Sequence, residues 1–317
     1  MTRTLITGGF GFISRYLAPM LLEEGHEVAL MDVVTDNAYL SRLQRDVTVF
    51  RSSVGNWGQV LDAVKTFRPH IIMHAGAVLP PLSEESPQLA FQVNIEGSYY
   101  VLEAARLFDC KQVIYASSIA SFGPDAPSHL VPNDFSQHPT GIYGVSKVCT
   151  ERLGEYYTTR YGIDFRAVRF TPIFGPGRAA SSGWTAYTSV AVEESAKGNP
   201  FAFKVAPEAA TGILYVRDAA RSLLDLAKAD ESRLVHRSFN LHGFVVTAQE
   251  LHDAILRHVP DARLSFEPDE RITAFVNSIP RQLDDSVAKA EWDWLPQFDL
   301  DGAVADFVAT VQRPDRG

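Results

Sequence analysis

The chain has 317 residues, of which 46% are hydrophobic and 21% are charged. This composition is typical of a globular protein and unlike that of a disordered or collagen-like chain. The 38 acidic residues outnumber the 29 lysines and arginines, giving a formal net charge of -9 at pH 7. Because an acidic surface repels phosphate backbones and anionic lipid, we expect neither a nucleic-acid partner nor a membrane partner.

The two cysteines, Cys110 and Cys149, have no Cys-x-x-Cys spacing, and the histidines follow no metal-ligand pattern such as His-Glu-x-x-His. We therefore expect no bound metal. The first residues lead straight into a strand pattern without a secretory leader, and no apolar run is long enough for a membrane span. The sequence predicts a cytoplasmic protein with reduced thiols.

The first half of the chain alternates short apolar runs with segments of helical periodicity. Strands are predicted at 4–7, 27–32, 47–51, 70–75, 112–117 and 164–170. Helices are predicted between them at 11–24, 58–67, 87–108 and 143–161, and Pro19 should kink or shorten the first. Several strands are almost entirely apolar, as parallel strands covered on both faces are. This order predicts an α/β protein with a doubly wound parallel sheet.

The pattern changes after residue 170, where prolines, glycines and small residues predict a loop. A helix is expected at 187–198. A second should follow the capping-box sequence from Thr247 to Glu250 and end at His258, and a third should start near Asp284. We expect a nucleotide-binding domain over 1–170, to which 212–242 returns. Residues 171–211 and 243–317 should form a smaller, mostly C-terminal substrate-binding domain.

A glycine-rich turn follows the first predicted strand and opens the first helix. Gly8 and Gly11 allow the backbone to approach a pyrophosphate, and the N–H groups of the helix start, at Phe12 and Ile13, attract its charge. Asp32, at the end of the second strand, has the spacing of an acid that accepts hydrogen bonds from the adenosine ribose and repels a 2′-phosphate. Together these features predict binding of NAD in preference to NADP.

Tyr143 and Lys147 lie four residues apart, on one face of a predicted helix. Ser118 ends the fifth strand, at the edge where ligands bind to such sheets. A tyrosine hydroxyl serves as a base at neutral pH only if its pKa is lowered. We expect Lys147 and a positively charged nicotinamide to lower it, Ser118 to hold the substrate oxygen and Tyr143 to take its proton. An ordinary aromatic residue and a solvated lysine are the alternative interpretation.

With these motifs, the whole chain resembles the extended short-chain dehydrogenase/reductase family, whose members have a Rossmann fold and include the NAD-dependent epimerases and dehydratases. The residues that match its fingerprint are Gly8, Gly11, Asp32, Ser118, Tyr143 and Lys147. The resemblance implies further cofactor contacts at Ser53, Val54, Ala75, Gly76, Ala77, Asn94, Ser117, Pro172 and Ile173. It also implies that Asn94 supports the fifth strand and a proton-relay water, and that two helices, 87–108 and 143–161, form a homodimer.

Within this family, the segment 117–124, the Tyr143–Lys147 motif and the sequence around Trp292 and Trp294 are most similar to the L-threonine 3-dehydrogenase branch. The substrate pocket departs from that branch, since Pro80 replaces a substrate-contacting serine and Ala186 replaces an aspartate. A desolvated ammonium group needs such partners, which favours a different substrate, such as a hydroxy acid, a sugar acid or a less polar alcohol. The candidate substrate contacts are Pro80, Ser118, Thr171, Arg178 and Thr185, with Arg178 either binding a carboxylate or simply solvated.

Three functions remain open from the sequence. The first is NAD-dependent oxidation of a secondary alcohol to a ketone, in a small polar substrate such as a hydroxy acid, a sugar acid or an amino-acid-like compound. The second is a nucleotide-sugar 4-epimerase with tightly held NAD. Members of that branch usually carry an asparagine where this chain has Pro172 and an arginine near Thr211, and both are missing here. The third is a non-catalytic NAD-binding sensor, which the retained Tyr143–Lys147 pair disfavours.

Overall fold

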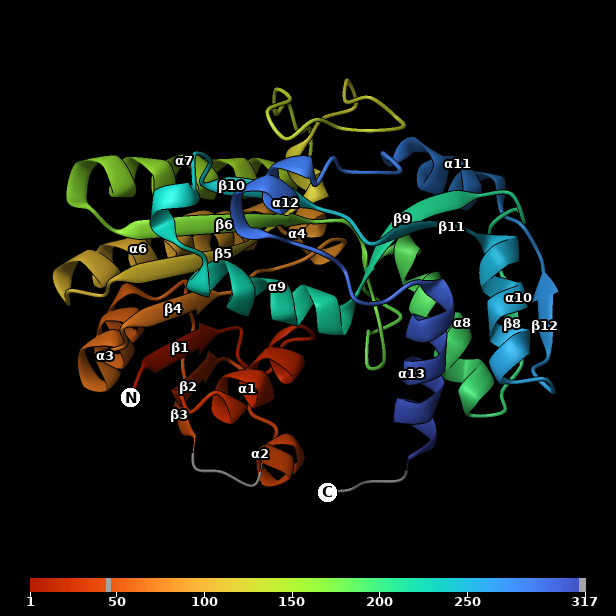
Figure 1. Ribbon diagram of the computed structural model, residues 1–317, viewed down its shortest axis with the longest axis horizontal. Coiled ribbons are helices and arrows are strands. Elements are labelled where there is room, and N and C mark those ends of the chain that lie inside the picture. The colour runs from red at the N-terminus through yellow and green to blue at the C-terminus, as the bar shows by residue number, and fades with distance from the viewer. Residues whose placement is uncertain (44–46, 314–317) are drawn as a thin grey trace.

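A seven-stranded parallel sheet forms the centre of the protein (Figure 1). The computed structural model describes residues 1–43 and 47–313. The strands follow the spatial order β10-β6-β5-β4-β1-β2-β3, and every neighbouring pair is parallel. They are β1 (Arg3–Thr7), β2 (Glu27–Asp32), β3 (Thr48–Arg51), β4 (Ile71–His74), β5 (Gln112–Ser118), β6 (Asp164–Phe170) and β10 (Ser238–Leu241). The predicted α/β fold with a doubly wound sheet is confirmed.

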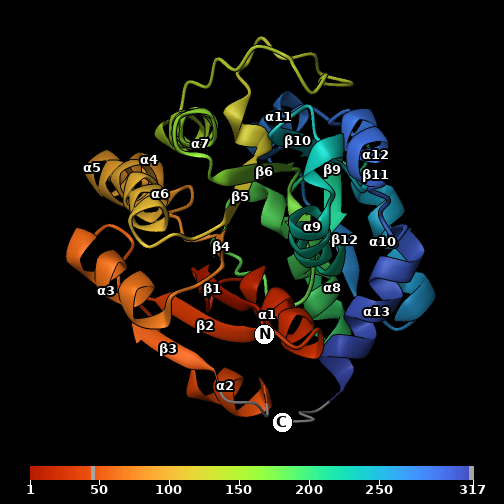
Figure 2. The ribbon, with the colours of Figure 1, turned by 60° about the vertical axis from the view of Figure 1, so that its left-hand side comes forward.

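Helices cover both faces of this sheet (Figure 2). Successive strand residues point to opposite faces, so Leu5 and its neighbour Ile6 belong to two different apolar clusters. On the Leu5 side lie α3 (Trp57–Phe67), α6 (Gly97–Leu107) and α7 (Ile142–Tyr161). On the Ile6 side lie α1 (Ser14–Glu23), α9 (Val216–Lys228) and α12 (Ser286–Trp292). Burial on both faces explains why the strand sequences are almost entirely apolar.

Two glycines let α7 approach the sheet closely. A Cβ atom at Gly154 would lie 2.3 Å from the Phe165 ring, and one at Gly144 would lie 2.1 Å from the carbonyl oxygen of Ala120. Neither position has room for a side chain. The helix is therefore fixed against β6 and against the chain that follows β5, which holds Tyr143 beside the end of β5.

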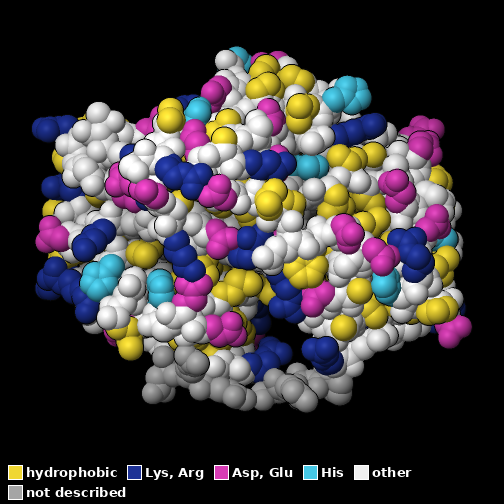
Figure 3. All heavy atoms as spheres, in the orientation of Figure 1, with side chains coloured by type: hydrophobic (Ala, Val, Ile, Leu, Met, Phe, Trp, Pro, Cys, Tyr) yellow, Lys and Arg dark blue, Asp and Glu magenta, His cyan; other side chains and the backbone are white. Residues whose placement is uncertain are grey.

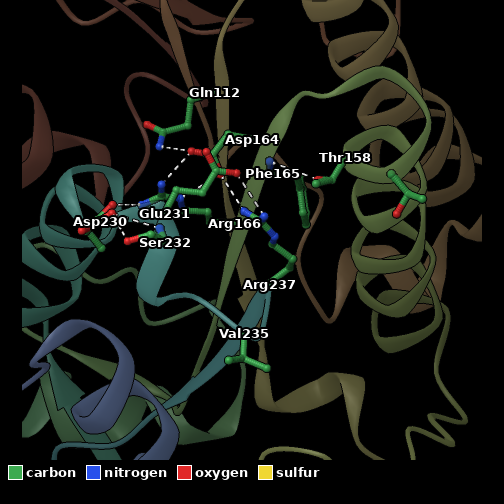
Figure 4. A network of polar contacts seen from close by, with 12 residues as sticks. Gln112, Thr158, Asp164, Phe165, Arg166, Asp230, Glu231, Ser232, Val235 and Arg237 are labelled. Atoms are coloured by element: carbon green, nitrogen blue, oxygen red, sulfur yellow. Dashed lines mark hydrogen bonds and ion pairs between the residues drawn. The ribbon is translucent and has the colours of Figure 1, made fainter.

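A polar network at the opposite, amino edge of the sheet joins β10 to β6 (Figure 4). Asp164, the first residue of β6, pairs with Arg166 at 2.7 Å and with Arg237 at 3.0 Å. Arg237 immediately precedes β10 and also pairs with Glu231 at 3.1 Å. Gln112, at the start of β5, donates to Asp164 at 2.8 Å. The amino edge is thus occupied by structural ion pairs, and the carboxyl edge carries the candidate site.

A second group of elements surrounds an apolar core of its own, on the right of Figure 1. It contains a three-stranded sheet of order β11-β9-β7, with β7 (Ile173–Phe174), β9 (Ala210–Tyr215) and β11 (Phe244–Thr247), and a pair formed by β8 (Phe201–Phe203) and β12 (Leu264–Phe266). Its helices are α8 (Tyr187–Ala196), α10 (Ala248–His258), α11 (Glu270–Ser278) and α13 (Leu300–Gln312). The predicted capping box is confirmed, because Thr247 and Glu250 bond each other's backbone N–H groups at the start of α10.

Several segments differ in detail from the sequence predictions. The expected helix 87–108 consists of α5 (Pro87–Ala90), a π-helix (Phe91–Glu96) and α6. The first helix begins at Ser14 and not at residue 11, because the preceding residues form the glycine turn, and Pro19 lies within its ten residues. Two short helices, α2 (Asn37–Leu43) and α4 (Leu82–Glu85), were not predicted, and neither were α9, α11 and α13. Short 3-10 helices lie at Ile119–Ser121, Trp184–Ala186 and Glu231–Arg233.

Candidate active site

The turn after β1 packs directly against the turn after β4. Gly8 has a φ of +66°, in the region that favours glycine, and a Cβ atom there would lie 2.7 Å from the Cα atom of Gly76. The helix α1 then begins at Ser14 without a side chain that caps its first N–H groups. Free N–H groups and the positive end of the helix dipole suit an anionic ligand. The turn therefore suits the pyrophosphate of a dinucleotide.

Asp32 ends β2 and is held against this turn. One carboxylate oxygen accepts the N–H of Phe10 at 3.0 Å, and the other accepts the N–H of Val34 at 3.2 Å. Each oxygen keeps a lone pair for a ribose hydroxyl. Arg15, which bonds the carbonyl oxygen of Phe10, is paired with Asp36 at 2.8 Å, so its charge is already balanced without a 2′-phosphate.

The other expected cofactor contacts lie along the same carboxyl edge. Ser53 and Val54 follow β3, and Ala75, Gly76 and Ala77 follow β4. Asn94 lies in the π-helix, where its side chain accepts the N–H of Val78 at 2.7 Å and donates to the Val78 carbonyl at 2.9 Å. The expectation that Asn94 supports the fifth strand is therefore wrong, because both of these bonds fix the chain after β4.

Tyr143, Ser118 and Lys147 lie together at the end of β5. Ser118 Oγ accepts the N–H of Ala120 at 3.1 Å, and its interaction with the Tyr143 hydroxyl favours the phenolate. Lys147 is one helical turn further along α7 and is only 3% exposed. Its Nζ donates to the Ala116 carbonyl at 2.7 Å and lies 5.2 Å from the centroid of the Tyr143 ring. The structure thus brings the three predicted catalytic residues together.

Burial governs the protonation of Tyr143 and Lys147 in the protein alone. Burial raises the pKa of Tyr143 to about 12, and the hydrogen bond with Ser118 offsets only part of that rise. Burial also lowers the pKa of Lys147 to about 7, against the opposing effect of the Glu151 charge. Lys147 was expected to acidify the phenol, but the lysine is itself desolvated. In the protein alone, Tyr143 is therefore protonated at neutral pH, and its ionisation needs a further positive charge.

Glu151 is a buried acid that the sequence analysis did not single out. It lies four residues after Lys147 on α7 and is fully buried. Arg169 pairs with it at 2.7 Å, and the Ser117 hydroxyl donates to it at 2.5 Å. Ser117 was expected to contact the cofactor, but its side chain instead bonds Glu151 inside the protein. The spacing from Lys147 was the available signal, since residues four apart share a helix face.

Glu84 caps α7 from another part of the chain. The helix follows Gly141, which has no side chain to serve as a cap. The carboxylate of Glu84, in α4, accepts the N–H groups of Ile142 at 3.2 Å and of Tyr143 at 3.1 Å. A carboxylate at a helix N-terminus is stabilising, and this one fixes the turn that carries Tyr143. No local pattern reveals the cap, because the two residues lie 59 positions apart.

The expected substrate contacts lie on two segments. Pro80 follows β4 and is joined to Pro81 by a cis peptide bond. Thr171 follows β6, and its buried hydroxyl has no hydrogen-bond partner among the described residues. Arg178 donates to the carbonyl oxygen of Ile173 at 2.8 Å and to the Thr185 hydroxyl at 2.9 Å. The structure thus gathers Ile173, Arg178 and Thr185, whereas Pro80 belongs to the segment on the other side of β5.

Pro172 and Ile173 connect the two sheets. Pro172 accepts the N–H of Leu214 at 3.1 Å, and Ile173 pairs with Leu214 in the three-stranded sheet. Phe170, just before them, is the register partner of Ser118. The chain from Phe170 to Ile173 therefore passes Ser118 on its way to the second group of elements.

Residues 1–43 and 47–313 contain no group of three or more His, Cys, Asp or Glu side chains able to hold a metal ion. None of the helices in these ranges is both long and apolar enough to cross a membrane. Acidic and basic side chains are interspersed over the face shown in Figure 3.

Comparisons with known proteins agree with this geometry. Residues 4–241 match the model of the NAD dependent epimerase/dehydratase family. The mitochondrial L-threonine 3-dehydrogenase of Bos taurus is 32% identical over 306 residues, covering 94% of this chain and 79% of the relative. A GalE-like L-threonine dehydrogenase from Cupriavidus necator, solved in its holo form, has a TM-score of 0.89 and 30% identity, over 98% of this chain and 99% of its own.

A UDP-glucose 4-epimerase from Thermotoga maritima, solved with UDP-glucose, has a TM-score of 0.84 but only 22% identity, over 97% of this chain and 98% of its own. It shares the fold. The chain belongs to the NAD-dependent epimerase/dehydratase family, and NAD is its cofactor. More narrowly, it is an NAD-dependent dehydrogenase of the extended short-chain dehydrogenase/reductase type.

Proposed function

We propose that this enzyme oxidises a secondary alcohol to a ketone, with Tyr143 as the base that takes the hydroxyl proton. The observation that carries the proposal is the convergence of Tyr143, Ser118 and Lys147 at the end of β5. This is the carboxyl edge of a parallel sheet, where ligands of open α/β folds bind. The turn that suits a dinucleotide lies at the same edge, after β1.

In this proposal each residue has one task. Ser118 holds the alcohol oxygen beside the Tyr143 hydroxyl, and Tyr143 takes the proton. NAD, when bound, would supply the hydride acceptor and a positive charge that favours the phenolate. Lys147 adds to that charge when it is protonated. Removing one proton and one hydride from the carbinol leaves a ketone, so the atoms and electrons balance.

We propose that the cofactor binds along the carboxyl ends of the strands in the central sheet. Asp32 would bind the adenosine ribose, and the N–H groups of the α1 start would bind the pyrophosphate. The further proposed contacts are Gly8, Gly11, Phe12, Ile13, Ser53, Val54, Ala75, Gly76, Ala77, Asn94, Tyr143, Lys147, Pro172 and Ile173. We propose the division expected from the sequence, with 1–170 and 212–242 holding the cofactor and 171–211 and 243–317 covering the substrate.

The proposed substrate is a small polar compound that carries the alcohol, such as a hydroxy acid, a sugar acid or an amino-acid-like molecule. Several of the solved and curated relatives are L-threonine dehydrogenases. In this chain, Pro80 and Ala186 offer no side-chain group to bind an ammonium. That difference favours a substrate other than threonine, and Pro80, Ser118, Thr171, Arg178 and Thr185 are the proposed contacts.

NADH formation distinguishes a dehydrogenase from an epimerase. We expect the purified protein to accumulate NADH, seen by its absorbance, with at least one member of a panel of hydroxy acids, sugar acids and secondary alcohols. A nucleotide-sugar epimerase would instead interconvert UDP-sugars with NAD that copurifies and is not consumed. Interconversion of UDP-sugars without net NADH, or inactivity across the whole panel, would contradict the proposal.

We further propose that the enzyme is a homodimer formed through α6 and α7. These adjacent helices carry large exposed side chains, of which Tyr99 and Leu107 on α6 are 42% and 44% exposed, and Tyr156 and Tyr161 on α7 are 53% and 43% exposed. Exposed aromatic side chains gathered on one surface favour protein association. A related solved structure is that of a monomeric L-threonine 3-dehydrogenase, so the proposal rests on the exposed side chains of α6 and α7 and not on the fold.

Sedimentation velocity tests the homodimer. We expect the wild type to sediment at twice the chain mass of 35.0 kDa and the Tyr156→Glu variant to sediment as a monomer, because a buried unpaired charge opposes association. Leu295→Glu is the matched control, since Leu295 is 63% exposed outside α6 and α7. A wild type that sediments as a monomer would disprove this assembly.

We propose a cytoplasmic location. Both cysteines are free thiols, with Cys110 buried and Cys149 partly buried. Free thiols are the usual state in a reducing compartment.

A further inference from the structure

Arg178 differs from the other arginines whose side chains are largely buried. Arg166 pairs with Asp164, Arg169 pairs with Glu151, and Arg221 pairs with Asp218. Arg178 has no carboxylate within ion-pair distance among the described residues, although it is partly buried. Its partners are neutral oxygens, and burial lowers its pKa to about 10. A desolvated guanidinium without a counter-ion is costly, so an anionic ligand would supply the missing partner.

The first acidic residue after Arg178 in the sequence, Glu193, is paired with another cation. Glu193, in α8, accepts the N–H of Gly177 at 3.2 Å, which is the residue before Arg178. Its carboxylate also pairs with Lys197 at 2.7 Å, and that lysine takes up its charge. The positive charge of Arg178 therefore stays unbalanced in the protein alone.

The geometry around Arg178 leaves hydrogen-bond donors for such a ligand. The two terminal nitrogens of the guanidinium bond the Ile173 and Thr185 carbonyls, the Ser182 carbonyl and the Thr185 hydroxyl. The remaining Nε–H makes no hydrogen bond within residues 1–43 and 47–313. Because the Thr185 hydroxyl accepts from Arg178, its own proton is left to donate. One cation and two free donors are what a carboxylate needs.

Arg178 is bonded to the chain segment that follows β6 and passes Ser118. Ser118 is the register partner of Phe170 at the end of β6. Ile173, whose carbonyl oxygen anchors Arg178 at 2.8 Å, is three residues further along the same chain. The unpaired charge is thus tied to the segment that passes Ser118, and Pro176 of the same segment accepts the hydroxyl of Tyr16 in α1 at 2.9 Å.

We propose that Arg178 and Thr185 bind a carboxylate of the substrate, so that the enzyme oxidises a hydroxy acid without an amino group. This inference rests on the proposed function, which supplies Tyr143 and Ser118 at the alcohol end. Ala186, next to Thr185, is buried and offers no acid for an ammonium. The enzyme would therefore distinguish a hydroxy acid from its neutral amide by the charge alone.

The test compares carboxylates with their amides by binding. NADH-loaded wild type is titrated with the straight-chain series from acetate to hexanoate and with the corresponding amides, followed by calorimetry or ligand-observed NMR. We expect at least one carboxylate to bind tenfold to about a hundredfold more tightly than its amide, as a charge-assisted hydrogen bond provides. Arg178→Gln should remove that difference and leave the amide and NADH affinities unchanged. Arg257→Gln is the control, because Arg257 pairs with Asp301 on the surface.

The same variants are then assayed with 2-hydroxybutanoate and 3-hydroxybutanoate, each enantiomer beside its amide. A rise in KM confined to the acids supports the carboxylate site. Equal loss with acids and amides would mean that Arg178 only fastens the loop, and the inference would be overturned. It would also be overturned if no carboxylate in the series bound wild type better than its amide. Failure of the proposed function is seen separately, as absence of NADH binding or as unchanged activity of Tyr143→Phe.

Discussion

Tyr143→Phe should lose turnover while keeping its affinity for NAD. The change removes the only atom that can take the alcohol proton in the proposed reaction, and the aromatic ring stays in place. General-base catalysis contributes about a hundredfold to ten-thousandfold, so we expect kcat to fall by at least about a hundredfold. The measurement is NADH formation with an alcohol that the wild type oxidises, beside NADH binding followed by fluorescence.

The pH dependence gives this prediction a second readout. Because burial raises the pKa of Tyr143 to about 12 in the protein alone, the phenol is protonated at neutral pH. The wild-type rate should therefore increase as the pH rises. Tyr156→Phe is the matched control, since Tyr156 lies on the same helix and is 53% exposed. A Tyr143→Phe variant with wild-type kcat would refute the proton-transfer role, and a variant that has lost NADH affinity would point to a structural one.

Glu151→Leu should lower the free energy of unfolding by about 3–5 kcal/mol, the cost of removing one partner from a buried ion pair. Glu151 is fully buried, and Arg169, which is 4% exposed, pairs with it at 2.7 Å. The leucine leaves the guanidinium without its carboxylate and the Ser117 hydroxyl without its acceptor. Denaturant unfolding followed by fluorescence measures the change.

Two further variants distinguish the cost of leaving a buried charge unpaired from the cost of simply removing a glutamate side chain. Glu155→Leu, one turn along α7, removes an exposed pair with Arg152 and should cost less than about 1 kcal/mol. Glu151→Leu combined with Arg169→Leu should recover much of the lost stability, because two apolar side chains replace the pair without leaving a charge behind. If the single variant unfolds like the wild type, Glu151 does not stabilise the sheet edge as argued.

Much of the central sheet could be predicted because its signals are local. The strands from β1 to β6 are apolar runs bounded by polar residues, and each was found within about two residues of its expected bounds. The α10 cap at Thr247 depends on a residue pair three positions apart, and it formed as expected. A π-helix differs from an α-helix in the hydrogen-bond partner of each N–H group, and no residue type in Phe91–Glu96 marks that change. Its different hydrogen bonding could therefore not be seen in the sequence.

The part of the candidate site that could be predicted depends on a short helix motif and on the end of a strand. Tyr143 and Lys147 share a helix face, and Ser118 ends the strand beside them, so their meeting follows from the fold. Asn94 and Glu84 were not predictable in the same way. The first bonds Val78 and the second caps the helix of Tyr143, through contacts between segments that no local pattern relates.

The protonation of Tyr143 was also beyond the sequence. Spacing shows that Lys147 is near the phenol, but it does not show that both side chains are buried. Desolvation acts on each group against its charged form. The depth of burial depends on how closely α7 packs on the sheet, and this closeness depends on the absence of side chains at Gly144 and Gly154.

The place of β10 in the chain has a consequence for biosynthesis. When a ribosome has released only residues 1–170, β6 is the outermost strand, because its neighbour β10 has not yet been made. The helix α9 and the tryptophans Trp292 and Trp294, which cover the Ile6 face, come later still. The nascent cofactor half therefore carries an unpaired backbone edge and an apolar face that is only partly covered, by α1 and α2, until the rest of the chain emerges.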